Sequence, residues 1–154
     1  MQVATSTERP TLRDPAFQGY WILRVAFVIA PILFGLDKFF NWAVYWPSYL
    51  APWLDRLIPG TAQDFLYVVG AIEILAGLLV LISPKWGSLI VAIWLAGIVI
   101  NLLTAYPPQY YDIALRDFGL FLAAVTLNRL ATAFGATTIA SQVHRPYVVQ
   151  SRAA

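Results

Sequence analysis

The chain has 154 residues, of which 60% are hydrophobic and 12% charged, and its mean hydropathy is +0.68. Soluble domains carry about 25% charged residues, so this composition excludes a water-soluble globular domain and favours lipid as the solvent. The absence of cysteine excludes disulfides, thiolate metal sites and thiol nucleophiles, and the ten basic and eight acidic residues form no run that would bind nucleic acid.

Residues 1–19 contain charged residues and two prolines but no short apolar run before a small-residue cleavage site. We therefore expect a retained cytoplasmic N-terminal arm rather than a signal peptide.

Four apolar stretches follow, each with the ~20 residues that a helix needs to cross a bilayer core of about 30 Å. They lie at about 20–40, 63–83, 86–105 and 115–134. The sequence thus predicts an all-α, polytopic membrane four-helix bundle over 20–134 and a cytoplasmic tail over 135–154.

The connector between the first and second spans is rich in aromatic residues. Five of them recur at the spacing of one helical face, although Pro47 and Pro52 interrupt any regular helix. They are Trp42, Tyr45, Trp46, Tyr49 and Trp53. Amphipathic rings favour the headgroup layer, so we expect an interfacial aromatic belt. A lid over a ligand entrance is the alternative.

The basic residues near the span ends indicate the orientation. Few residues separate the second and third spans, so these two form a tight antiparallel hairpin. Six basic residues fall on one side of the membrane: Arg9, Arg13, Lys85, Arg129, Arg145 and Arg152. Three fall on the other side: Lys38, Arg56 and Arg116. Because cytoplasmic loops are enriched in lysine and arginine, both termini are expected in the cytoplasm.

Ionisable side chains inside the spans are the candidates for chemistry, since inserting each costs about 2.5–3.5 kcal/mol and they normally face a protein partner. Glu73 shares a helical face with Gly70 and Gly77, where small residues let a neighbouring helix approach closely. Gly97 and Asn101 are expected to form the same arrangement on the third span. The alternating span directions gather the polar residues of the outer half into one predicted pocket, open or gated toward the outer leaflet, with Glu73 at its base. Its residues are Lys38, Glu73, Asn101, Arg116 and Asp117.

Desolvation disfavours the charged form of a buried carboxylate, and a nearby cation favours it. A carboxylate under these two opposing effects is suited to taking up and releasing protons, as quinone reduction or proton-coupled transport requires. The alternative is an ion-pair network that only fixes helix register. Arg24 is expected to extend to the cytoplasmic headgroups. His144, in the tail, has no companion of ligand type nearby, so neither a metal site nor a covalently bound cofactor is expected.

Three segments carry a resemblance to a known family. The first span reads LRVAFVIAPILFGLDKFFN, the second AIEILAGLLVLISP, and the fourth begins RDFGLFLAAVTLNRL. Together they resemble the DoxX-like family of small four-helix bacterial membrane proteins, over about residues 20–132. The family shares an arginine early in helix one, a Gly-x-x-Lys near its end and a glutamate followed by glycine in helix two. Here these are Arg24, Gly35 with Lys38, and Glu73 with Gly77.

The resemblance implies membrane-associated redox work, because members include quinone-reactive subunits of thiosulfate oxidation and partners of other oxidoreductases. We therefore expect a small subunit of an oxidoreductase in the bacterial cytoplasmic membrane, with lipid and other membrane subunits as partners and quinone as its ligand. It would be at most a subunit of a quinone-linked enzyme with no cofactor ligands of its own. In this reading Glu73 shuttles protons, Lys38 and Arg116 stabilise a quinone oxygen, and Asn101 donates a hydrogen bond.

Two other functions stay open. The first is a non-catalytic accessory subunit of a larger membrane complex, which the aromatic, weakly charged exterior favours. The second is a homo-oligomeric, proton-coupled exporter of a cationic solute. Four-helix exporters of that type carry their essential glutamate in the first helix, whereas Glu73 is in the second span, which counts against this function.

Overall fold

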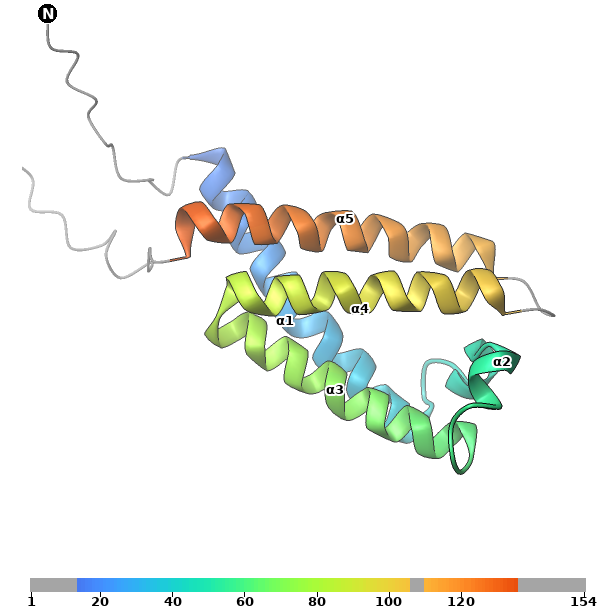
Figure 1. Cartoon of the computed structure of the whole chain (residues 1–154). Coiled ribbons are helices and arrows are strands. Elements are labelled where there is room, and N and C mark those ends of the chain that lie inside the picture. Colours follow the sequence, from blue (N-terminus) through green and yellow to red (C-terminus); the bar gives the residue numbers. More distant parts are fainter. Residues whose placement is uncertain (1–13, 106–109, 136–154) are drawn as a thin grey trace, which may run out of the picture.

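The computed structural model of the chain describes residues 14–105 and 110–135 (Figure 1). Its regular elements within these ranges are all helices: α1 (Pro15–Phe40), η1 (Trp46–Tyr49), α2 (Pro52–Asp55), α3 (Ala62–Ile82), α4 (Pro84–Thr104) and α5 (Tyr111–Phe134). Four of them, α1, α3, α4 and α5, are long and apolar enough to cross a membrane. The predicted all-α, four-helix membrane bundle is therefore confirmed.

The first and last spans begin earlier than predicted. α1 begins at Pro15 rather than at residue 20, because Asp14 accepts a hydrogen bond from the Ala16 N–H (2.9 Å) and proline suits the first helical turn. Residues 15–19 of the predicted arm are therefore helical. α5 begins at Tyr111 rather than at residue 115. The rest of the predicted arm, residues 1–13, and the tail from residue 136, which contains His144, lie outside the described residues.

Glycines bring α1 and α3 close together. A Cβ atom added at Gly35 would lie 2.6 Å from the Gly70 carbonyl oxygen, and one added at Gly70 would lie 2.6 Å from the Gly35 carbonyl oxygen. A Cβ at Gly77 would lie 2.9 Å from the Val28 carbonyl oxygen. The predicted close approach at Gly70 and Gly77 is thus present, and the neighbouring helix is α1.

The four long helices form two pairs, α1 with α3 and α4 with α5. The pairs contact each other through α3 with α4 and through α1 with α5. α4 follows α3 after a tight turn at Ser83, as predicted. Figure 1 shows α3 and α4 close together at this turn and spread apart at their other ends, where α2 lies. We call the end with the turn the inner end and the end with α2 the outer end.

An aromatic cluster packs the inner end, where the Phe134 ring of α5 lies 5.5 Å from Phe17 and 6.0 Å from Tyr20 of α1, between ring centroids. Arg24 extends from α1 to α3 beside this cluster. Its guanidinium donates to the Leu81 carbonyl oxygen (2.7 Å) and to the Tyr20 hydroxyl (3.1 Å). Arg24 thus satisfies a carbonyl in the last turn of α3.

Large apolar side chains cover the outside of the four long helices. Several are more than half exposed, among them Ile22, Leu33, Leu75, Ile93 and Leu115. In water such a surface would drive aggregation, whereas in a bilayer the acyl chains solvate it. The exterior thus fits contact with lipid.

Candidate functional site within the membrane helices

An ion pair lies buried between α1 and α3. The Lys38 ammonium is 2.7 Å from Glu73 Oε2, and their side chains are only 5% and 8% exposed. A side chain leans toward the N-terminus of its own helix. Because α1 and α3 run in opposite directions, Lys38 leans inward and Glu73 leans outward. The two charged groups therefore meet beside the crossing of the helices.

Two tryptophans complete the surroundings of the pair. The Trp94 indole N–H, from α4, donates to Glu73 Oε1 (3.4 Å), and the Trp46 ring, from the connector, lies 3.7 Å from the Lys38 ammonium. The ammonium also donates to the Phe34 carbonyl oxygen (3.5 Å). Such a cation over an indole face is attracted by the ring quadrupole. We call Lys38, Glu73, Trp46 and Trp94 the polar site.

Asp37 holds Trp46 in place. Its carboxylate accepts hydrogen bonds from the Trp46 indole N–H (2.7 Å) and from the backbone N–H groups of Trp42 (2.9 Å) and Ala43 (3.0 Å). α1 ends beside it, at Phe40, and the following residue, Asn41, turns the chain with a left-handed φ of 53°. The carboxylate thereby fixes the first turn of the connector and aims the Trp46 ring at the ammonium.

Asn101 lies apart from the pair and binds the connector. Its amide donates to the Tyr49 carbonyl oxygen (2.7 Å) and its oxygen accepts from the Ala51 N–H (2.9 Å). Two further hydrogen bonds join the connector to neighbouring residues: Trp53 donates to Thr104 and Tyr110 donates to Ser48. Asn101 was expected to face a ligand, but both ends of its amide are occupied by the connector backbone.

Arg116 and Asp117 differ in their placement. The Asp117 side chain is 10% exposed, whereas the Arg116 side chain is 64% exposed. Arg116 Nε donates to Asp117 (3.1 Å). Of the five residues of the predicted pocket, Lys38 and Glu73 are therefore in direct contact. Asp117 is buried and pairs with Arg116, and Asn101 binds the connector.

The connector aromatics also separate into two groups. Trp42 and Tyr45 are 80% and 66% exposed, as an interfacial belt requires. Trp46 instead turns inward onto Lys38. The short elements η1 and α2 replace one regular helix, because Pro47 lies in the first turn of η1 and Pro52 begins α2. One stripe of five aromatics is therefore not formed.

Trp94 was missed by the sequence analysis, although a signal was present. It precedes Gly97 by three residues and Asn101 by seven, so it shares the α4 face that carries these two. The expectation that Gly97 lets a neighbouring helix approach is wrong, since a Cβ added there would meet no atom within 4 Å.

No group of three or more metal-ligating side chains occurs among residues 14–105 and 110–135. A hollow of about 380 Å³ lies at the inner end, away from the polar site, and is lined by residues 82–86 together with Ala131, Thr132 and Gly135. Within the polar site the chemistry available is proton exchange and hydrogen bonding by one ammonium and one carboxylate in apolar surroundings.

Comparison with known proteins gives no match: no protein-family model, curated protein or solved structure is significantly similar to this chain.

Proposed function

We propose that the chain is a small subunit of an oxidoreductase or electron-transfer complex in the bacterial cytoplasmic membrane, with both termini cytoplasmic, and that its polar site exchanges protons with a membrane-dissolved quinone. The observation that carries this proposal is the Lys38–Glu73 pair, an ammonium and a carboxylate 2.7 Å apart and buried among helices long and apolar enough to span a membrane. The DoxX-like sequence features support the redox class.

The ammonium geometry suggests how a quinone would bind. Lysine has three N–H bonds. Two point to Glu73 and to the Phe34 carbonyl oxygen, and the third side of the ammonium lies against the Trp46 ring. A quinone oxygen can accept a hydrogen bond from the third N–H group if the Trp46 ring moves aside. The ammonium would then stabilise the negative charge that develops on this oxygen.

Proton and electron balance define the role of Glu73. Reduction of a quinone to a quinol consumes two electrons and two protons. In the proposal the electrons come from a redox-active partner subunit, and Glu73 passes protons from the aqueous side to the quinone oxygen beside Lys38. The chain would then be responsible for quinone binding and proton delivery, and the partner for electron transfer.

The test is quinone binding by the full chain in lipid nanodiscs, with decylubiquinone as the probe and tryptophan quenching as the readout. We expect saturable binding that Glu73→Gln and Lys38→Met each weaken at least tenfold. Lys85→Met is the matched control, because Lys85 is exposed at the inner end. Wild-type protein that does not bind, or variants that bind as tightly as wild type, would overturn the proposal.

A non-catalytic accessory subunit is the second candidate function. It is favoured by the internal hydrogen bonds of the polar groups: Glu73 is bonded to Lys38 and Trp94, and Asn101 to the connector. If this function is correct, replacing the ion pair by apolar residues leaves turnover of the native complex unchanged. The same replacement abolishes turnover if the first proposal is correct.

A further inference from the structure

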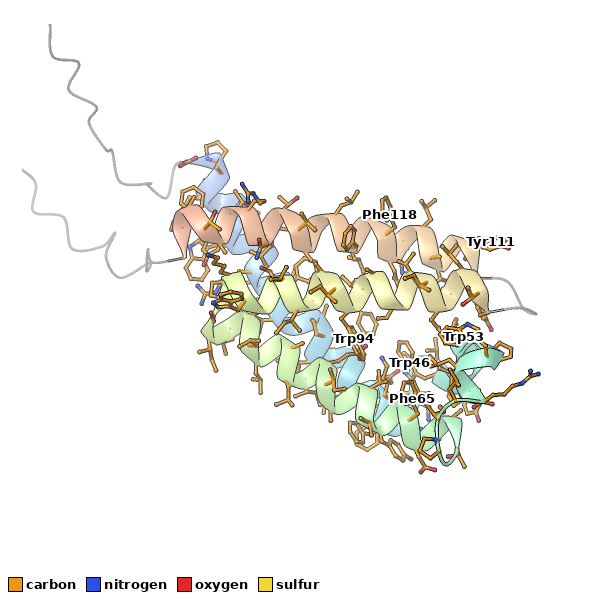
Figure 2. The ribbon with its side chains drawn as sticks, viewed as in Figure 1. Trp46, Trp53, Phe65, Trp94, Tyr111 and Phe118 are labelled. Atoms are coloured by element: carbon orange, nitrogen blue, oxygen red, sulfur yellow. The ribbon has the colours of Figure 1, made fainter. Side chains whose placement is uncertain are left out.

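We infer that the hollow at the inner end binds the headgroup of an anionic phospholipid, with the Lys85 ammonium as its charged contact. The hollow has a volume of about 380 Å³ and is lined by the α3–α4 turn and the end of α5 (Figure 1). Figure 2 shows Trp46 and Trp94 of the polar site away from this turn. The inference therefore does not depend on the proposed function.

The lengths of the helices place the hollow at the level of the lipid headgroups. α3 and α4 each have 21 residues, and at 1.5 Å per residue this length matches the bilayer core of about 30 Å. The turn between them, at Ser83, then lies where the core meets the headgroups. Trp86 lines the hollow and is 59% exposed, and indole rings favour this layer. Phospholipid headgroups are thus the molecules that surround the hollow.

Contacts within the bundle fix the walls of the hollow. Asn128 of α5 donates a hydrogen bond to the Lys85 carbonyl oxygen (2.7 Å), which joins α5 to the first turn of α4. α3 and α4 touch directly at Gly87, because a Cβ added there would overlap the Val80 backbone. A headgroup can therefore enter a preformed site without rearranging the helices.

The charges at the inner end favour an anion. Among the described residues, this end carries three basic residues, Arg24, Lys85 and Arg129, and one acidic residue, Asp14. The rest of the described chain carries three basic and six acidic residues. Neither ion pair between described residues involves Lys85, and the Asp14 carboxylate caps α1. Basic pockets between spanning helices bind anionic headgroups, so the charge matches an anionic lipid better than a zwitterionic one.

The start of α4 adds hydrogen-bond donors to the ammonium. The first N–H groups of a helix have no acceptor within that helix, and Ser83, the N-cap of α4, makes no side-chain hydrogen bond to them. Lys85 and Trp86 lie in this first turn and both line the hollow. Their N–H groups and the Lys85 ammonium can bind phosphate oxygens together. Ile82, on the same wall, is 80% exposed and offers apolar surface to the acyl chains.

The first test is titration of the full chain in detergent micelles with phosphatidylglycerol, followed by native mass spectrometry, which counts the lipids bound to each chain. We expect one phosphatidylglycerol to bind at least tenfold more tightly than phosphatidylcholine, and Lys85→Met to weaken this binding at least tenfold. Arg129→Met is the matched control, because it removes the same charge from the same end but Arg129 does not line the hollow. It should change the affinity less than twofold.

A second pair of variants tests the shape of the hollow without changing its charge. Thr132 and Thr126 are both exposed on α5, and each donates its hydroxyl to a backbone carbonyl oxygen of the preceding turn. Of the two, Thr132 alone lines the hollow. Thr132→Phe should fill the hollow and weaken phosphatidylglycerol binding at least tenfold, whereas Thr126→Phe should leave it unchanged.

The outcomes separate a built lipid site from weaker explanations. Equal affinity for phosphatidylglycerol and phosphatidylcholine would overturn the inference. Equal losses in Lys85→Met and Arg129→Met, or in Thr132→Phe and Thr126→Phe, would also overturn it, because binding would then reflect the general charge or surface of the inner end. A large excess of inorganic phosphate should not displace the lipid. Displacement would assign the hollow to a soluble phosphate and overturn the phospholipid.

Discussion

Gly35 and Gly70 face each other across the crossing of α1 and α3, each placed so that its missing Cβ would lie 2.6 Å from the carbonyl oxygen of the other. Lys38 and Glu73 each lie three residues further along their own helix. Their side chains lean back toward the crossing and meet there. The backbone contact between two glycines therefore sets the position of the ion pair.

Gly70→Ala should lower the free energy of unfolding by about 1–3 kcal/mol, because the added methyl group overlaps a backbone carbonyl that cannot rotate away. Unfolding by sodium dodecyl sulfate in mixed micelles measures the change. Gly119→Ala is the control, since nothing lies within 4 Å of the added group, and it should stabilise α5 by about 0.5–1 kcal/mol through helix propensity. Equal effects of the two substitutions would show that the crossing is looser than described.

The ion pair should show strong coupling between its two members. Glu73→Leu or Lys38→Met alone leaves an unpaired charge in the bundle and should cost about 3–5 kcal/mol of unfolding free energy. The double variant removes both charges and should lie within about 1–2 kcal/mol of wild type, because apolar residues of similar volume replace a buried pair well. A double-mutant cycle with the same unfolding assay checks this. Additive single effects would mean that the two groups do not interact.

The spans and the Lys38–Glu73 face were predictable because they depend on local properties. Composition identifies four apolar stretches, and the three- and four-residue spacing of Gly70, Glu73 and Gly77 identifies a face that a neighbouring helix approaches. The early start of α1 was missed because the charges and prolines before residue 20 suggested an arm. A Pro15 preceded by Asp14 is itself a helix-start signal.

The roles of Asn101 and Trp46 could not be predicted, because each depends on a partner chosen by the tertiary structure. Asn101 binds backbone groups about 50 residues away, which leaves no trace in helical periodicity. Trp46 fits the aromatic stripe only if the connector is a regular helix, and the connector instead combines a left-handed turn with two short helices. Gly97 carried the same small-residue signal as Gly70, yet a Cβ added there would meet no atom within 4 Å.

Removal of the Asn101 amide should loosen the connector without disturbing the helix pairs. Asn101→Leu loses two hydrogen bonds, each with a net contribution of about 0.5–1.5 kcal/mol, so the Ala51 amide should exchange with deuterium at least tenfold faster. Asn128→Leu removes a hydrogen bond to the Lys85 carbonyl oxygen at the inner end and serves as the control. Unchanged exchange at Ala51 in Asn101→Leu would mean that the connector is held by its other contacts.

Amine labelling should report how well Trp46 covers Lys38. The chain has two lysines, and Lys85 is exposed, so it serves as an internal reference in the same molecule. With a small amine-reactive acylating reagent, mass spectrometry should find Lys85 modified and Lys38 at least tenfold less modified, because Lys38 is paired with Glu73 and lies under the Trp46 ring. Trp46→Ala removes the ring and its anchor to Asp37, so Lys38 labelling should rise several-fold relative to Lys85.

Trp42→Ala is the matched control for this experiment, because Trp42 belongs to the same connector but is 80% exposed and stacks on Phe40 at a centroid distance of 4.5 Å. It should leave the labelling ratio of the two lysines unchanged. If Trp42→Ala and Trp46→Ala raise Lys38 labelling equally, the protection comes from the connector as a whole and not from the Trp46 ring. If neither does, the Glu73 pair alone protects the amine.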